Sequence, residues 1–421
     1  MLAENTKSNI KQNRIYSIIA LLFIAALLLF LELNRSRFSW GGMAVTVIQK
    51  SLIFAVVAVS MNLLNGFTGL FSLGQAGFMA IGAYVTAILT IPLDRVDGVY
   101  YMNGMAPWLK GFKEILSVLP EPLLIIVAML IGGIIAGIFA FLIGIPVLRL
   151  KSDYLAIATL GFSEITRAIL SAPQMDTITN GSYGLKNIPG LAITGTNLPQ
   201  GTGALLIPFL FAVVAIGFVI LVINSGYGRA FKAIREDEVA AEAMGINLLK
   251  HKEMSFVISS FITALAGGML AMFMRSIEAR TFSIMLTYDI LLIVVIGGLG
   301  SVTGSIVGAF VVTFAKDWIL RFFDTPLVIG GFQVPLLRIG FRMVVFSLLL
   351  MIVVLFYRRG LLGNREFSWD GVRRLFAGRF GKKPVPDIMD KDPEPMYKQP
   401  LIPDPPAGEP GEEESHDDTN A

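Results

Sequence analysis

The chain has no cysteine among its 421 residues and only two histidines, His251 and His416. The lack of cysteine excludes disulfides, thiolate metal sites and a cysteine nucleophile. Two histidines far apart in the sequence leave little material for a histidine metal site. Charge is also scarce, because Asp, Glu, Lys and Arg make up 15% of the chain. We therefore expect no catalytic centre, no bound metal, no cofactor and no nucleic-acid partner.

Hydrophobic residues are abundant instead. They make up 54% of the chain, and the mean hydropathy is +0.70. Such a composition is far from that of a soluble globular protein and indicates a chain embedded in lipid. The 42 glycines and 30 phenylalanines suit transmembrane helices that approach one another closely. The sequence therefore predicts an all-α, polytopic transmembrane helical bundle.

Apolar runs of roughly the length that crosses a bilayer recur along the chain, and we count about ten. The first, 15–33, is expected to be a retained span, because the sequence Asn-Arg-Ser-Arg follows it and no small-residue cleavage site does. The other runs are 45–64, 72–93, 123–145, 152–170, 204–223, 256–274, 288–299, 302–315 and 344–357.

Segment 65–78 is too apolar for an exposed loop and too rich in glycine for a plain helix. Irregular backbone at membrane depth is tolerated only where protein or a water-filled path surrounds it. The polar residues in and near such segments are therefore candidates for a translocation path: Asn62, Asn65, Gln75, Thr159 and Glu164.

Ionisable residues also occur inside the predicted spans. Glu164 and Arg167 lie three residues apart, so they share one face of a helix. Mutual pairing is the plain explanation, and a functional role is the alternative. Together with Asp289, these residues would supply an ion relay if the chain worked alone as a secondary transporter.

The stretch Asn224–Glu253 is the long polar and charged segment between the central apolar runs. Apolar residues at helical spacing predict one short amphipathic helix over Phe231–Met244. Gly228 is expected to break the chain before this helix, and Gly245 to end it.

Several motifs resemble one family of membrane proteins. Gly228-Arg229-Ala230, Ala233-Ile234-Arg235-Glu236 and 240–246 look like the cytoplasmic coupling loop of ABC importer permeases. The closest resemblance is to the M-type permease subunit of branched-chain amino acid importers. Segments 63–84, 152–162 and 179–189 are similar to the same family, and the resemblance covers about residues 45–365.

This resemblance implies a function. The loop would dock on ATPase subunits through Gly228, Arg229, Arg235, Glu236, Glu238, Glu242 and Gly245. The implied partners are a homologous permease subunit, two ABC ATPase subunits and an extracytoplasmic substrate-binding protein. The implied cargo is a branched-chain or other hydrophobic amino acid, with urea or short amides as the alternative. ATP hydrolysis would belong to the partners, since Ser305 follows Gly304 where a phosphate-binding loop needs lysine.

Basic residues predict the topology. They cluster at 149–151, in the coupling loop 225–253 and at 358–365. The positive-inside rule places all three clusters and both termini in the cytoplasm of a bacterial cell, with 94–121 and 172–203 outside. Arg35 and Arg37 are exceptions to this rule.

We therefore expect three parts, 1–44 with the first span, the permease domain 45–365, and a cytoplasmic C-terminal region 366–421. From Pro384 onward the chain holds eleven acidic residues, two lysines and nine prolines. This composition predicts a disordered tail, because it cannot bury a core.

Overall fold

The computed structural model describes residues 2–35, 37, 41–150, 152–191 and 203–320, with isolated positions between 328 and 366. The chain divides into two units, Met1–Phe367 and Ser368–Ala421, and every described residue belongs to the first. Most of the predicted last span 344–357 and the whole acidic tail lie outside the described residues.

The described chain is helical, as predicted. Its α-helices are α1 Leu2–Leu33, α2 Gly41–Asn62, α3 Gln75–Thr90, α4 Leu93–Val99, α5 Pro107–Leu116, α6 Glu121–Val147, α7 Ser152–Leu170, α8 Asp176–Thr179, α9 Leu206–Asn224, α10 Gly226–Glu236, α11 Glu238–Ala243, α12 Leu248–Met274, α13 Ile284–Gly297 and α14 Val302–Phe314. Short π-helical turns (η1 Leu63–Phe67, η5 Ala315–Ile319) and 3-10 turns (η2 Pro173–Met175, η3 Gly181–Tyr183, η4 Ala279–Phe282) link them. Strands β1 Val328–Ile329 and β2 Phe332–Gln333 form one small antiparallel pair.

Six of these helical segments are long and apolar enough to cross a membrane. They are Tyr16–Leu33, Gly41–Phe67, Glu121–Val147, Leu206–Asn224, Leu248–Met274 and Val302–Ile319. The number rises to eight if each of two bent helix pairs, α3 with α4 and α7 with η2 and α8, is one broken span. Helix α13 is apolar but shorter. The chain is therefore a multi-pass membrane protein.

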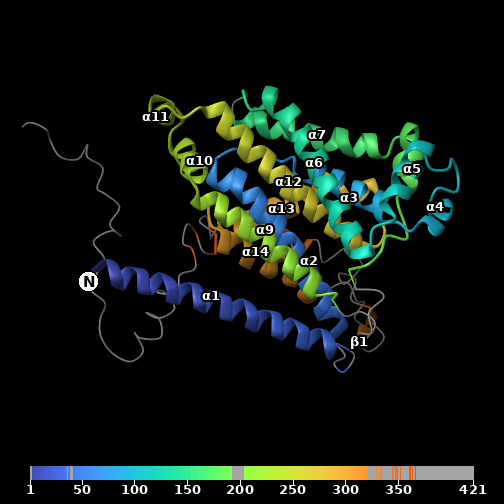
Figure 1. Ribbon diagram of the computed structural model, residues 1–421, viewed down its shortest axis with the longest axis horizontal. Helices are drawn as coiled ribbons and strands as arrows, with labels where there is room; N and C mark the ends of the chain where they lie inside the picture. Colours follow the sequence, from blue (N-terminus) through green and yellow to red (C-terminus); the bar gives the residue numbers. More distant parts are fainter. Residues whose placement is uncertain are drawn as a thin grey trace, which may run out of the picture. The chain divides into compact units, whose positions relative to one another are not determined.

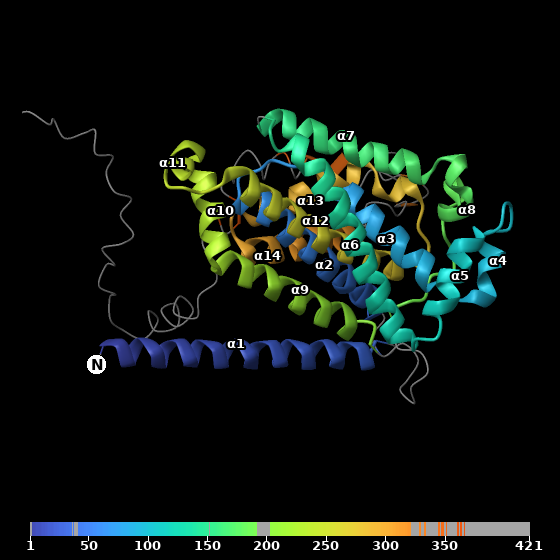
Figure 2. The same ribbon diagram turned by 45° about the horizontal axis from the view of Figure 1, so that its top comes forward.

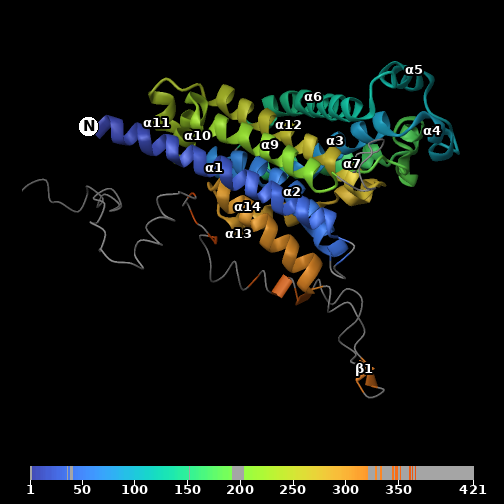
Figure 3. The same cartoon turned by 60° about the horizontal axis from the view of Figure 1, so that its bottom comes forward.

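Helices α2, α3 and α12 form the centre of the bundle. Helix α12 packs against α3, α6 and α2, and α14 and α13 pack against α2. Helices α10 and α11 lie at one end of the bundle, and α4 and α5 lie at the other (Figure 1). Figures 2 and 3 show α1 running along the side of the bundle, where it contacts α2 and α9.

Glycine lets α3 and α12 approach backbone to backbone. A Cβ atom at Gly82 would overlap the main chain of Ala264, and one at Gly267 would overlap the carbonyl of Met79. Lipid gives helices no hydrophobic drive to associate, so close contact through small residues provides much of the packing energy. The core therefore depends on these two positions.

Glu32 ties the end of α1 to the bundle. Its carboxylate accepts hydrogen bonds from the backbone N–H groups of Ala204 at 2.7 Å and Leu205 at 3.3 Å, just before α9. The side chain is buried, with 5% of its surface exposed. The carboxylate satisfies two buried backbone N–H groups in the turn before α9, and its negative charge complements the dipole of that helix.

The predicted outer loops also contain helices, and hydrogen bonds join the two loops. The Tyr100 hydroxyl donates to the carbonyl of Ile178 at 2.7 Å, and the Asn180 amide donates to the carbonyl of Val99 at 3.0 Å. The Lys113 ammonium donates to the carbonyl of Ile88 at 2.8 Å, near the end of α3. Burial lowers the pKa of Lys113 to about 8.

We predict that Gly82→Ala destabilises the bundle. The new methyl group must push α12 away, and overpacking of this kind costs about 1–3 kcal/mol or more. The matched control is Gly161→Ala in α7, where nothing lies within 4 Å of the new Cβ atom. There alanine should be neutral or stabilising by up to about 1 kcal/mol. Thermal unfolding of both variants in detergent tests this, and equal midpoints would contradict it.

Candidate functional site

The charged central loop folds into two short helices, so the prediction of one helix over Phe231–Met244 was wrong. Helix α10 ends at Glu236 and α11 begins at Glu238. Asp237 separates them, and its carboxylate accepts from the N–H groups of Val239 at 2.8 Å and Ala240 at 3.0 Å. This N-cap interaction competes with continuation of the first helix.

Gly228 does not break the chain, contrary to the prediction, because it lies inside the first turn of α10. A Cβ atom there would overlap the backbone of Ile223, so glycine allows α10 to pack against the end of α9. Gly245 does follow the end of α11, with φ +83°. A positive φ of this kind favours glycine and stops the helix as expected.

Helix α12 contains the predicted span 256–274 and extends it toward the N-terminus. Helix α12 begins at Leu248, so residues 248–253 of the predicted loop are helical. The Asn247 side chain caps this helix by accepting from the N–H group of Lys250 at 3.0 Å. The Lys252 ammonium lies 2.7 Å from the Glu238 carboxylate and joins α11 to α12. The polar residues thus extend α12 beyond the apolar run.

One face of α10 is anchored in the bundle. Phe231 and Ile234 are buried. Arg235 is half-buried, and its guanidinium donates to the carbonyl of Gly66 at 2.7 Å. The same side chain lies against Gly69 and Gly300, so the absence of Cβ atoms there makes room for it. Arg235 therefore connects the central loop to η1 and to the turn between α13 and α14.

The outer surface of α10 and α11 is open. The predicted coupling residues Arg229, Glu236, Glu238 and Glu242 are all exposed. Two apolar side chains accompany them, Val239 with 78% and Met244 with 83% of their surface exposed. Exposed apolar groups rimmed by charged ones are typical of a surface that another protein covers.

Asn62, a predicted path residue, is hydrogen-bonded to the backbone of the turn between α13 and α14. Its amide nitrogen donates to the carbonyls of Gly298 and Ser301 and to the hydroxyl of Ser305, at 3.3, 2.8 and 2.7 Å. Its amide oxygen accepts from the N–H group of Gly300 at 2.8 Å. The side chain is fully buried, and these bonds use nearly all of its capacity.

Asn65 and Thr159 form hydrogen bonds with the backbone of the irregular segment after η1. The Asn65 side chain exchanges two hydrogen bonds of 3.3 Å with the backbone of Ser72. The Thr159 hydroxyl on α7 accepts from the N–H group of Leu73 at 3.0 Å. Gln75 instead bonds across to α12, at 3.2 Å to the hydroxyl of Ser259 and 2.6 Å to that of Thr263. The part that these residues take in translocation stays a prediction.

Glu164 pairs with Arg167 at 2.8 Å, as the plain explanation predicted. Asp289 pairs with a different residue, Lys316, at 2.5 Å. The structure therefore divides the three residues of the suggested ion relay between two separate ion pairs.

Sequence reasoning missed a further ion pair at membrane depth. The Lys50 ammonium in α2 lies 2.5 Å from the Asp317 carboxylate in η5. Both line a cavity of about 500 Å³ together with Gly42, Met43, Thr46, Val47 and Phe273. The sequence held two clues to this site, the charge of Lys50 inside the apolar run 45–64 and the charged residues Lys316 and Asp317 directly after the run 302–315.

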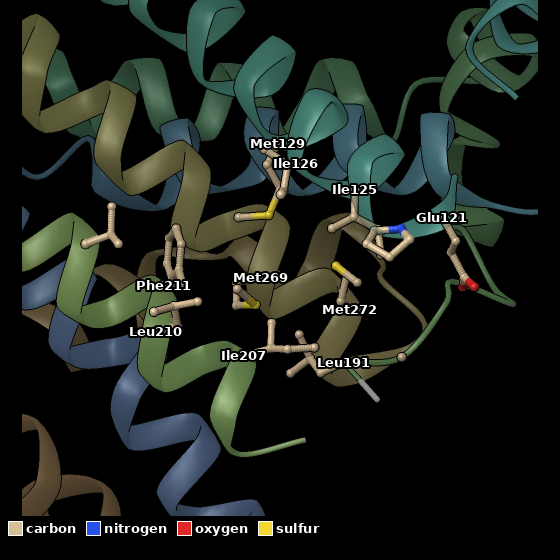
Figure 4. Close-up of a pocket in the computed structure, with 13 residues that line it drawn as sticks. Glu121, Ile125, Ile126, Met129, Leu191, Ile207, Leu210, Phe211, Met269 and Met272 are labelled. Carbon is tan, nitrogen blue, oxygen red and sulfur yellow. The ribbon is translucent and has the colours of Figure 1, made fainter. Parts of the chain in front are cut away.

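A second hollow is apolar. It has a volume of about 430 Å³ and lies between α6, α9 and α12, where its lining includes Ile126, Met129, Phe211, Met269 and Met272 (Figure 4). Within the part of the chain that the structure describes, no three His, Asp or Glu side chains gather as a metal site would require.

The described chain is a multi-pass helical bundle with a loop of short helices exposed at one end, as in a membrane permease. The chain belongs to the family of permease components of branched-chain amino acid transport systems, whose sequence model matches residues 43–357.

Individual relatives agree with this assignment. The chain is 30% identical to the high-affinity branched-chain amino acid transport system permease protein LivM of Escherichia coli, over 74% of this chain and 72% of that protein. It is 25% identical to the probable branched-chain amino acid transport permease protein LivM of Methanocaldococcus jannaschii, over 78% and 96%. It is also 26% identical to the galactofuranose transporter permease protein YtfT of Escherichia coli, over 74% and 79%. No solved structure matches the chain.

We predict that Arg235→Met destabilises the protein, while Arg229→Met on the exposed face of the same helix does not. The first change leaves the Gly66 carbonyl without its charged donor, and such a loss costs about 1–3 kcal/mol. Thermal unfolding of the purified chains in detergent compares the two. A midpoint for Arg235→Met that equals that of Arg229→Met would show that the contact does not anchor the loop.

Proposed function

We propose that this chain is one permease subunit of an ABC importer that carries branched-chain or other hydrophobic amino acids across the plasma membrane of a bacterium. It would work with a homologous permease subunit, two ATPase subunits and an extracytoplasmic binding protein. The observation that carries the proposal is the central loop, which is anchored on one face by Arg235 and open on the other around Glu242. Family membership supports the same conclusion.

The loop is suited to transmit force. An ATPase that docks on α11 would move α10 with it, because Asp237 and the Glu238–Lys252 pair hold the two helices and α12 together. Arg235 would pass this movement to Gly66 in η1, just after α2, and to the turn at Gly300. The ATPase cycle would thereby shift the equilibrium between outward-open and inward-open states of the bundle.

The proposed coupling residues divide by role. Arg229, Glu236, Glu238 and Glu242 form the docking face, whereas Gly228, Arg235 and Gly245 set the shape and attachment of the loop. The proposed path passes Asn62, Asn65, Gln75, Thr159 and Glu164. Asn62, Asn65 and Thr159 bind irregular backbone, Gln75 binds α12, and Glu164 binds Arg167. Their hydrogen bonds favour a role in shaping the path walls.

Branched-chain or other hydrophobic amino acids are the proposed cargo, because the matching family and the LivM relatives are named for branched-chain amino acid transport. Urea or short amides remain the alternative cargo within the same architecture. A transporter that works alone is disfavoured, because Glu164 and Asp289 belong to separate ion pairs and the central loop would have no role.

We further propose about ten spans with both ends in the cytoplasm. The first span lies in 1–44, the others lie in a permease domain 45–365, and a cytoplasmic region 366–421 follows. Glu366 supports this topology, because its carboxylate accepts from the N–H groups of Val302 at 2.6 Å and Thr303 at 3.2 Å. These residues start α14 beside Gly300 and Arg235, at the end of the bundle that carries the central loop.

Single cysteines in this cysteine-free chain test the topology. Met244→Cys lies at the exposed tip of the central loop, and Tyr101→Cys, with 63% of the tyrosine exposed, lies at the opposite end. We expect an impermeant thiol reagent to label position 101 but not position 244 in intact cells. Lysis should expose both. Labelling of position 244 in intact cells would place the central loop outside and contradict the proposed topology.

We predict that Glu242→Arg abolishes ATPase docking and uptake, although the chain still inserts and accumulates. Like charges facing each other at an interface can cost several kcal/mol. Gly245→Val should act similarly, because a branched residue at φ +83° is strained by about 1–2 kcal/mol. The matched control is Glu114→Arg, an equal inversion on an exposed residue at the opposite end. Co-purification with the ATPase and amino-acid uptake are measured together. Normal uptake by both loop variants would contradict the importer proposal.

A further inference from the structure

Two ion pairs lie side by side within the membrane-spanning part of the bundle. Lys50 of α2 pairs with Asp317, and Lys316 pairs with Asp289 of α13, each at 2.5 Å. Lys316 and Asp317 are neighbours on the π-helical turn η5. All four side chains line one small hollow beside Phe54. Isolated π-helical turns are frequent at functional sites, and ionisable groups at membrane depth are functional candidates.

The larger cavity leads to this cluster from the end of the bundle opposite the central loop. It begins at Gly42 and Met43, near the start of α2, and Phe273 at the end of α12 forms part of its wall. Lys50 lies about 13 Å along α2 from the start of that helix. In the proposed topology, the cavity therefore opens toward the extracytoplasmic side, from which cargo arrives.

The cluster is reachable from the cavity. The Lys50 and Asp317 side chains are 30% and 23% exposed, and both line the cavity wall. The other pair comes next along α2, because its hollow includes Phe54, one turn beyond Lys50. A ligand that enters the cavity therefore meets the Lys50–Asp317 pair first.

We propose that Lys50 and Asp317 bind the charged backbone groups of an amino acid during its passage, which rests on the proposed function. The ammonium of Lys50 holds the cargo carboxylate, and the carboxylate of Asp317 holds the cargo ammonium. Met43, Val47 and Phe273 provide the apolar wall for its side chain. Lys316 and Asp289 form a second station of the same kind.

Charge balance favours this class of ligand. The four side chains carry two positive and two negative charges, so a zwitterion exchanges partners with them without changing the net charge of the site. A ligand with a net charge would leave one charge uncompensated at membrane depth, which is costly. The site therefore selects amino acids with neutral side chains. Two stations in series also suit transport, because each holds the cargo weakly enough to release it.

The decisive variant replaces both members of the first pair by apolar residues, Lys50→Met with Asp317→Leu. Replacement of both members of this partly buried ion pair leaves no charge uncompensated, so the transporter should still assemble. We expect leucine uptake to fall more than about tenfold in proteoliposomes that contain the complete transporter, because two charged contacts to the cargo are lost. Lys50→Arg keeps the charge and should retain most of the uptake.

The control is the same double replacement at an exposed ion pair, Lys110→Met with Asp97→Leu. The ammonium of Lys110 lies 3.8 Å from the carboxylate of Asp97, at the end of the bundle opposite the central loop. It should leave uptake unchanged. If the apolar pair at 50 and 317 prevents assembly, the swapped pair Lys50→Asp with Asp317→Lys restores the tie between α2 and η5. With the charges exchanged, the cargo can bind only with its carboxylate and ammonium in exchanged positions, which turns its side chain away from the apolar wall. Uptake should therefore stay low. Full uptake by either double variant at 50 and 317 would show that the pair is only a structural tie.

Two further measurements separate failure of this proposal from failure of the proposed function and from binding of a lipid headgroup. If the unmodified transporter moves no leucine with ATP, the proposed function fails before any variant is compared. A zwitterionic lipid headgroup has the same chemistry as the cargo, so uptake is repeated in vesicles of phosphatidylglycerol, which has no ammonium group. In these vesicles we still expect leucine uptake by the unmodified transporter to exceed that by the apolar variant. Loss of that advantage would assign the pair to lipid and overturn the proposal.

Discussion

Lipid offers no hydrogen-bond partner to the backbone, so this chain must supply its own partners wherever a helix breaks at membrane depth. It does so at two places with polar side chains. Asn62 satisfies the turn between α13 and α14, and Asn65 and Thr159 satisfy the segment between η1 and α3. Without these contacts neither break would be stable, and α2, α3 and α14 would not meet as they do.

The same physics explains what the sequence could predict. A run of about 20 apolar residues in lipid has one stable conformation, so the predicted spans coincide closely with α2, α6 and α9. The segment 65–78 was recognisable as irregular because its composition suits neither a helix nor an exposed loop. Gly245 was recognisable as a helix stop because a positive φ costs glycine little.

Competition between local interactions was harder to predict. The periodicity of 231–244 fits one helix, yet the Asp237 carboxylate gains two hydrogen bonds by starting a second. Contacts between distant residues could not be predicted at all. Arg235 and Gly66 are 169 positions apart, and Lys50 and Asp317 are 267 apart. A single sequence shows that a charge sits in an apolar run, but only the fold shows which partner compensates it.

Helix α2 connects the two proposed sites, because Gly66 follows its end and Lys50 lies in its first half. Buried hydroxyl groups hold it against α12, where Ser60 donates to the carbonyl of Ser259 at 2.6 Å. A docking event can shift the bundle only by the difference in free energy that its contacts make between two states. A hydrogen bond from a charged donor such as Arg235 is worth about 1.5–3 kcal/mol. If it forms in one state alone, it biases the equilibrium by roughly 10- to 150-fold, which is the usual range of coupling between distant sites. One arginine is therefore enough to couple the loop to α2, provided that α2 moves as a rigid body.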